Sequence, residues 1–165
     1  MSDPWLGDYR DRVRPEWIDY NGHMNVAYYV LAFDRAADVL FDRLGLGMAH
    51  RQASNQGFFV VEAHVTYARE LLEGDPLRFE AWVVEAGERK LRYFLQVFHA
   101  QKNYRAAMIE FLGLNVDLST RRAAPFPLAL RSGLDAAVER DRLRGLPPEI
   151  GRAIGQPRTT KAELA

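Results

Sequence analysis

The sequence concentrates chemically useful residues at one tight turn, Trp17-Ile-Asp-Tyr-Asn-Gly-His-Met-Asn25. Asp19 offers a carboxylate, and the Asn-Gly pair at 21–22 predicts a turn that opens an apolar run with helical spacing. A helix N-terminus presents unpaired N–H groups and a partial positive charge, which stabilise an oxyanion. A carboxylate beside them attacks a carbonyl or activates a water to do so. The combination predicts an acyl-transfer site formed by Asp19, Gly22, His23 and Asn25.

Each of these residues also has a purely structural interpretation. Asp19 suits an Asx turn or a helix cap, and Asn25 suits a helix cap as well as it suits the placement of a water. His23 either positions the reacting carbonyl or bonds to the turn backbone, and the second interpretation is favoured. Asp34 lies inside the expected helix, where a salt bridge is favoured over a role as a helper acid.

Carboxylates inside expected strands form a second set of candidates. Glu62 and His64 are two residues apart, so they lie on one face of a strand, opposite Val61 and Ala63. Acids are infrequent in strands. Two interpretations stay open for this face: a solvated or inter-subunit surface, and the carboxylate of an acyl pocket. Glu110, within an apolar run, raises the same question.

Two kinds of element are expected to position these residues. Apolar residues recur at helical spacing over 25–44, and Gly45 is suited to end a helix. Period-two patterns then predict strands over 59–67, 77–83, 91–97 and 104–116. Short turns between the strands predict antiparallel pairing, and the long apolar helix must pack on the sheet. The expected fold class is therefore α+β, with an antiparallel sheet curled around a central helix.

The remaining chain and the far side of the sheet give two more expectations. Residues 128–144 fit a surface helix, and Pro147-Pro148 opens a polar end that is expected to be loosely held. The expected organisation is one domain over 1–130, followed by a C-terminal helix and flexible tail over 131–165. The strand faces turned away from the helix still carry large apolar residues, which predicts another subunit. These residues are Phe58, Val60, Trp82, Phe94 and Phe98.

Composition limits the classes of function. The chain has 165 residues, 48% hydrophobic and 27% charged, which suits one globular domain. Because 22 basic residues balance 22 acidic ones, a cationic surface for nucleic acid or membrane is not expected. The lack of cysteine excludes disulfides, thiolate catalysis and Cys-ligated metal. No segment reaches the ~20 apolar residues of a membrane span, and a cytoplasmic location is expected.

The turn motif also resembles a known family. Asp19-x-x-Gly-His-x-Asn25-x-x-x-Tyr29, followed by Phe33-Asp-x-Ala36, is similar to the signature of hotdog-fold acyl-CoA thioesterases of the 4-hydroxybenzoyl-CoA thioesterase type. The resemblance spans about residues 9–127. It implies a hotdog fold, hydrolysis of a CoA thioester, Asp19 as the catalytic carboxylate and helix amides that polarise the carbonyl. It also implies that no metal or cofactor takes part, and that a homodimer or dimer of dimers holds the acyl sites at subunit interfaces.

A narrower resemblance concerns the substrate. Residues 15–34 and 62–67 are similar to the thioesterase domain that accompanies carnitine dehydrogenase in carnitine breakdown. Members of that group hydrolyse betainyl-CoA to glycine betaine. A quaternary ammonium offers no hydrogen-bond donor, so its site needs aromatic faces and a nearby acid. The candidates are Trp17, Tyr20, Tyr28, Phe58 and Glu62, although core packing is the commoner fate of aromatic residues and a solvated or inter-subunit face is favoured for Glu62.

Two basic pairs are candidates for binding CoA, and three alternative functions are considered beside hydrolysis of betainyl-CoA. The basic pairs Arg89-Lys90 and Arg121-Arg122 are candidates for contacts with the CoA phosphates, although charged turn residues commonly just face water. A generic short-chain or aromatic acyl-CoA thioesterase would want a pocket without Glu62. A non-catalytic acyl-CoA-binding domain would need no attacking carboxylate, and a hydratase would place its Asp and His in a different motif.

Overall fold

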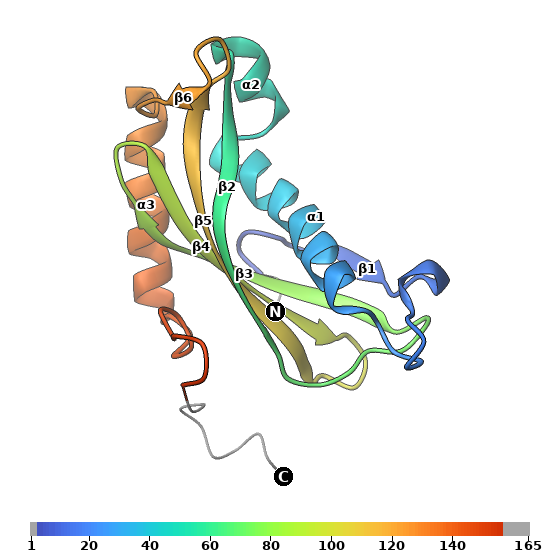
Figure 1. Cartoon of the computed structure of the whole chain (residues 1–165). Helices are drawn as coiled ribbons and strands as arrows, with labels where there is room; N and C mark the ends of the chain where they lie inside the picture. The colour runs from blue at the N-terminus through green and yellow to red at the C-terminus, as the bar shows by residue number, and fades with distance from the viewer. Residues whose placement is uncertain (1–2, 157–165) are drawn as a thin grey trace.

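One curled antiparallel sheet organises the residues that the computed structural model describes, 3–156 (Figure 1). The strand order is β1-β3-β4-β5-β2, and β6 pairs with β5. Three α-helices and one short 3-10 helix (Pro15–Trp17) accompany the sheet in this part of the chain, and the arrangement confirms the expected hotdog fold. The strands are β1 (Arg10–Arg12), β2 (Gln56–Tyr67), β3 (Pro76–Ala86), β4 (Lys90–His99), β5 (Arg105–Asp117) and β6 (Arg122–Ala123).

The central helix is α1 (Val26–Leu44), and its ends follow the sequence closely. Asn25 caps the first turn, because its side-chain oxygen accepts the Ala27 N–H at 3.0 Å. Gly45 ends the helix in the left-handed region, at φ 73°, where glycine has no steric penalty. Apolar side chains at helical spacing, among them Tyr29, Phe33 and Leu40, are buried against the sheet.

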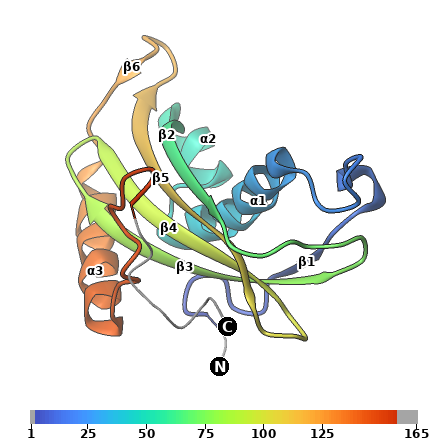
Figure 2. The same cartoon turned by 60° about the horizontal axis from the view of Figure 1, so that its bottom comes forward.

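The sheet face that α1 covers, here called the inner face, carries the alternating apolar residues of β3 and β4. Leu77 and Phe79 of β3 and Tyr93 and Leu95 of β4 are buried in the main core, as the period-two pattern predicts. Figure 2 shows α1 and the short helix α2 (Met48–Ser54) on this side and α3 (Leu128–Arg144) on the other. Helix α2 is not predicted by the sequence pattern, because its seven residues bury no side chain and so leave no apolar stripe.

A bulge in β2 changes which residues face the helix. The register of β2 against β5 shifts between Val60 and Glu62, so one extra residue enters β2 at this point. Phe58 therefore lies on the inner face, in ring contact with Phe41 of α1, and Phe59 lies on the opposite face. An unbroken period-two pattern over 59–67 would keep Phe59 on the same face as Ala63, and the bulge makes this wrong for the first half of the strand.

Helix α3 runs along the free part of β3 rather than over solvent. The Val83 N–H of β3 donates to Asp141 of α3 at 2.7 Å, and the indole of Trp5 donates to the same carboxylate oxygen at 2.6 Å. Arg144 donates to the Ala81 carbonyl. The helix thereby satisfies strand groups that β1 is too short to pair, and it protects this sheet edge.

The segment that follows α3 lies against the outer face of the sheet, the face turned away from α1. Trp82, Phe94 and Met108 form a second buried cluster there, and Ile150 packs against it. Glu149 forms an ion pair with Arg105 at 2.7 Å. This contact differs from the loosely held tail expected after Pro147. The chain covers much of the apolar outer face with its own residues, so Trp82 and Phe94 give no reason to expect another subunit.

The end of the chain that falls outside the described residues, 157–165, includes the rest of that expected tail. The division of the chain at residue 130 stays a prediction. Within the described residues, no helix is long and apolar enough to cross a membrane.

Candidate active site at the N-terminus of α1

Asp19 sits in a turn that closes immediately before α1. One oxygen of its carboxylate accepts the Asn21 N–H at 2.8 Å, which makes the Asx turn that the sequence suggests. The Gly22 N–H donates to the Asp19 carbonyl at 3.0 Å, and Gly22 has φ 82°, a conformation that L side chains rarely adopt. A bridge between Ile18 and Met24 closes the base of the turn. The structural and catalytic interpretations of Asp19 are compatible, because its second carboxylate oxygen has no hydrogen bond within residues 3–156.

Around the turn, two backbone N–H groups have no acceptor in the described residues. The Met24 N–H donates to the Leu71 carbonyl and the Asn25 N–H to the Trp17 carbonyl, at 2.8 and 2.9 Å. Gly22 is also engaged. For the amides of His23 and Val26 no acceptor is found in the described part of the chain. These two amides flank the first turn of α1, where the helix dipole adds positive potential, and they are the available donors for an oxyanion.

His23 and Asn25 support the turn more than they reach for a ligand. The His23 ring nitrogen Nδ1 lies 3.2 Å from the Met24 carbonyl, the backbone contact that was favoured for it. Asn25 is the helix cap. A cavity of about 200 Å³ opens beside the two open amides, and His23, Val26, Tyr29 and Tyr67 are among its lining residues.

Trp17, Tyr20 and Tyr28, three of the aromatic candidates for a substrate cation, do not form an aromatic pocket beside Asp19 in the described chain. Trp17 is 2% exposed and stacks on Tyr28, with ring centroids 5.8 Å apart. The guanidinium groups of Arg14 and Arg35 already lie over the Trp17 ring, at 5.3 and 5.7 Å from its centroid. Tyr20 is 97% exposed and contributes no wall. A cation-binding role for Trp17, Tyr28 or Tyr20 in this chain therefore has no support from their positions.

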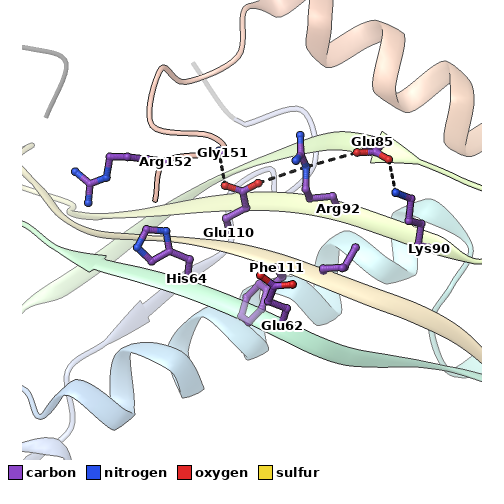
Figure 3. Close-up of a pocket in the computed structure, with 10 residues that line it drawn as sticks. Glu62, His64, Glu85, Lys90, Arg92, Glu110, Phe111, Gly151 and Arg152 are labelled. Carbon is purple, nitrogen blue, oxygen red and sulfur yellow. Dashed lines mark hydrogen bonds and ion pairs between the residues drawn. The ribbon is translucent and has the colours of Figure 1, made fainter. Parts of the chain in front are cut away.

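Glu62 and His64 lie on the outer face, in a mixed ionic surface that Figure 3 shows. Glu110 of the neighbouring strand forms an ion pair with Arg92 at 3.3 Å and accepts the Gly151 N–H at 2.7 Å. Lys90 pairs with Glu85 at 2.7 Å, and this contact lowers the pKa of Glu85. Glu62 is exposed on this face, whereas α1 and its N-terminus belong to the other. The solvated interpretation of Glu62 fits the structure better than an acyl-pocket carboxylate.

The two basic pairs gather at the end of the sheet farthest from Asp19. Arg89 lies in the turn between β3 and β4 and Lys90 begins β4, whereas Arg121 lies in the turn between β5 and β6 and Arg122 begins β6. Backbone bonds tie these turns together, since the Asn115 N–H donates to Arg89 and the Ala124 N–H to Asn115. Figure 1 shows this end beside the C-terminal end of α1. Arg89, Arg121 and Arg122 are exposed.

A second cavity, of about 410 Å³, lies between α1, α2 and the start of β2. Phe41 and Phe58 supply aromatic walls, and Asp34, Asp38 and Asp42 supply carboxylates. Asp34 has no basic partner within 4 Å in the described residues, so the expected salt bridge is absent. Sequence reasoning missed Asp38, Asp42 and Phe41, although three acids spaced four residues apart on one helix are visible in the sequence.

A family model and a similar known protein both indicate the same family for this chain. Residues 13–134 match the family model described as the thioesterase-like superfamily. The betainyl-CoA thioesterase of Pseudomonas aeruginosa is 32% identical to this chain over 152 residues, which cover 92% of this chain and 96% of that protein.

Solved structures agree with the fold. A Staphylococcus aureus protein solved in complex with CoA superimposes with a TM-score of 0.82 at 24% identity, covering 95% of this chain and 98% of that one. A Pseudomonas putida protein superimposes with a TM-score of 0.76 at 31% identity, covering 94% and 99%.

Proposed function

The chain belongs to the thioesterase-like superfamily, and from that premise we propose that it hydrolyses betainyl-CoA to glycine betaine and CoA. The enzyme class is acyl-CoA thioesterase. The choice of acyl group is supported by the similarity to the P. aeruginosa betainyl-CoA thioesterase over nearly the whole length of both proteins. One observation of the structure supports this chemistry most directly: the Asp19 carboxylate is held with one free oxygen beside the open first turn of α1.

In the proposed reaction the backbone amides stabilise the oxyanion, and the Asp19 carboxylate carries out or assists the attack. The thioester carbonyl binds with its oxygen toward the amides of His23 and Val26, which become stronger donors as negative charge develops there. Asp19 either removes a proton from an attacking water, or attacks the carbonyl carbon itself to form a mixed anhydride that a water then hydrolyses, which regenerates the Asp19 carboxylate. In both routes the carbon–sulfur bond breaks, the CoA sulfur takes a proton, and the acid leaves as its carboxylate. No step in this scheme requires a metal or organic cofactor.

We propose that the active assembly is at least a homodimer joined along β2. Strand β2 is a long edge strand, and its bulge residue Val61 is 54% exposed. An unpaired edge of this kind invites pairing with another strand. A two-fold axis across β2 would reverse the second copy, so that the Asp19 end of one chain meets the basic end of its partner.

This arrangement also accounts for the separation of Asp19 from the basic turns within one chain. Helix α1 has 19 residues, a length of ~28 Å, and the turns with Arg89, Lys90, Arg121 and Arg122 lie at its far end. In a dimer the partner brings the same four residues to the site, where they serve as the proposed contacts for the CoA phosphates.

A panel of thioesters tests the proposal. We expect kcat/KM for betainyl-CoA to exceed that for 3,3-dimethylbutanoyl-CoA, its neutral isostere, on the order of 100-fold, because one desolvated cation–π contact and a nearby acid together supply that discrimination. Butyryl-, phenylacetyl- and 4-hydroxybenzoyl-CoA complete the panel. Faster turnover of any neutral thioester would reject betainyl-CoA and leave a thioesterase of other specificity. Binding of all thioesters without hydrolysis would support a non-catalytic acyl-CoA-binding domain.

A further inference from the structure

The cavity between α1, α2 and β2 has the composition that a quaternary ammonium needs. Its volume of about 410 Å³ lies in the ~300–1,000 Å³ range of small-molecule sites. The rings of Phe41 and Phe58 both line it, with centroids 5.1 Å apart. Asp34, Asp38 and Asp42 line the same cavity against a single basic residue, Arg51. Aromatic side chains and a net negative charge are thus combined in one cavity.

The acids of this cavity are not explained by the fold. Asp34, Asp38 and Asp42 are spaced four residues apart, so like charges face each other along α1, which is unfavourable for a helix. Although Arg35 and Arg43 are neighbours in sequence, no Lys or Arg in residues 3–156 forms an ion pair with any of the three carboxylates. Burial and the charges of Asp34 and Asp42 raise the pKa of Asp38. A bound cation would remove this repulsion.

A buried phenol provides a second, independent observation. Tyr93 of β4 is 1% exposed, and its ring contacts both Phe41 and Phe58, with centroids 5.2 and 6.2 Å away. No hydrogen-bond partner for its hydroxyl is found in the described chain. Burial, together with the nearby charges of Asp34 and Asp38, raises the pKa of Tyr93. A buried hydroxyl without a hydrogen-bond partner is rare in a protein core, and the Tyr93 hydroxyl is also close enough to Asp34 and Asp38 to feel their charge. Both properties are typical of a ligand site.

We infer that this cavity binds the trimethylammonium group of the acyl chain, with Phe41 and Phe58 as aromatic walls and Asp34 and Asp38 as counter-charges. The inference rests on the proposed function and names the residues that select the substrate. It also replaces Trp17, Tyr20 and Glu62, which the sequence suggested for this role.

The covalent length of the substrate then requires that the cavity and Asp19 come from different copies of the chain. In a betainyl thioester one methylene joins the nitrogen to the carbonyl carbon, a separation of about 2.5 Å. Within one chain Asp34 follows Asn25 by nine helical positions, about 13 Å along the axis. Asp19 of the same chain is therefore out of reach. The two-fold arrangement across β2 brings the second copy's Asp19 end toward the start of β2, where this cavity lies.

Substitutions that remove charge without changing shape test the cation site. The Asp34→Asn/Asp38→Asn double variant should lower the ratio of kcat/KM for betainyl-CoA over 3,3-dimethylbutanoyl-CoA by tenfold or more, on the order of 100-fold at most. Both residues are exposed on α1, so the fold should survive. The matched control is Asp135→Asn, which makes the same change on exposed α3, and it should leave the ratio unaltered.

The outcomes separate this inference from the proposed function. A wild-type ratio far above one that persists in the double variant would overturn the cation site and leave betainyl-CoA hydrolysis standing. A wild-type ratio near one would overturn both.

Mixing two defective variants tests the contribution from a second copy. Asp19→Asn and Asp34→Asn/Asp38→Asn proteins are unfolded together, refolded as a mixture and assayed on betainyl-CoA. If the site is shared, half of the sites in each mixed dimer are intact, and random pairing should restore roughly a quarter of wild-type activity. If the site lies within one chain, the mixture should show no more than the average of the two separate variants, which would overturn the shared arrangement.

Discussion

At the scale of single residues, the Asp19 carboxylate uses one oxygen to hold the turn and leaves the other without a hydrogen bond in the described residues. Its Asx bond to the Asn21 N–H fixes the carboxylate, while the second oxygen accepts no hydrogen bond within residues 3–156. Asp19→Asn retains an oxygen for that bond but removes the base or nucleophile. We expect kcat to fall by a factor on the order of 100 or more, with KM and thermal stability little changed. Steady-state kinetics and a melting curve measure both, and wild-type turnover by the variant would contradict the role of Asp19.

The acids on α1 lead to a prediction about stability and pH. Burial and two neighbouring carboxylates raise the pKa of Asp38, so the folded protein holds this proton more tightly than the unfolded chain does. The stability that this group contributes is present below its unfolded pKa and is lost as pH rises through its folded pKa. Asp38→Asn should therefore raise the melting temperature at pH 7, by ~1–2 °C for ~0.5 kcal/mol, and have no such effect at pH 3.

Two controls accompany this measurement. Salt at 1 M should shrink the gain, because it screens repulsion between partly exposed charges. Asp135→Asn, at an exposed position on α3 and outside the three-acid row of α1, should not reproduce the rise at pH 7. A melting temperature that falls at pH 7 in the Asp38 variant would show that this carboxylate stabilises the fold instead.

Individual site residues differ in how far the sequence could identify them. Asp19 and Asn25 were identifiable because turn and capping signals act over a few neighbouring positions. The surroundings of Trp17 could not be predicted from the sequence, because its burial and its contacts with Arg14 and Arg35 depend on tertiary packing. Asp38 was within reach of sequence reasoning, through its four-residue spacing from Asp34, but only the structure places these acids beside Phe58 of a distant strand.

At the scale of elements, α3 is fastened to β3 by one buried carboxylate. Asp141 is fully buried, and its oxygen accepts both the Trp5 indole N–H and the Val83 backbone N–H. Asp141→Ala leaves these two buried donors unpaired, at a cost of ~1–3 kcal/mol each. We expect a loss of ~3 kcal/mol or more in the free energy of unfolding, measured in urea. Asp135→Ala on the same helix is the control, and it should change the stability by less than ~0.5 kcal/mol.

Helices and strands were predicted well where one hydrophobic period continues along the whole element, and poorly where a bulge or a change of period interrupts the pattern. Helix α1 and strands β3 and β4 were predicted nearly to their ends because each has a long uninterrupted period. The bulge at Val60 in β2 reverses the faces, and no residue type in that strand signals it. The placement of α3 also escaped prediction, since the sequence shows a helix but not the strand edge that it covers.

At the scale of the whole molecule, the unpaired edge of β2 and the two-ended distribution of site residues favour an assembly of two copies. The opposite edge is already protected by β1 and α3, which leaves β2 as the long edge open in the described chain. A negative charge on that edge should oppose strand pairing. Val61→Asp, at the exposed bulge, is therefore expected to give a monomer by light scattering.

The same variant separates assembly from folding, because Val61 is 54% exposed and its loss removes little from the core. We expect thioesterase activity to fall at least 100-fold although Asp19 is intact, since neither the cation cavity nor the basic turns of one chain reach its own Asp19. Leu143→Asp makes a comparable change at a 73% exposed position on α3 and should leave both the dimer and the activity unchanged. A monomeric Val61→Asp protein with full activity would show that one chain contains a complete site.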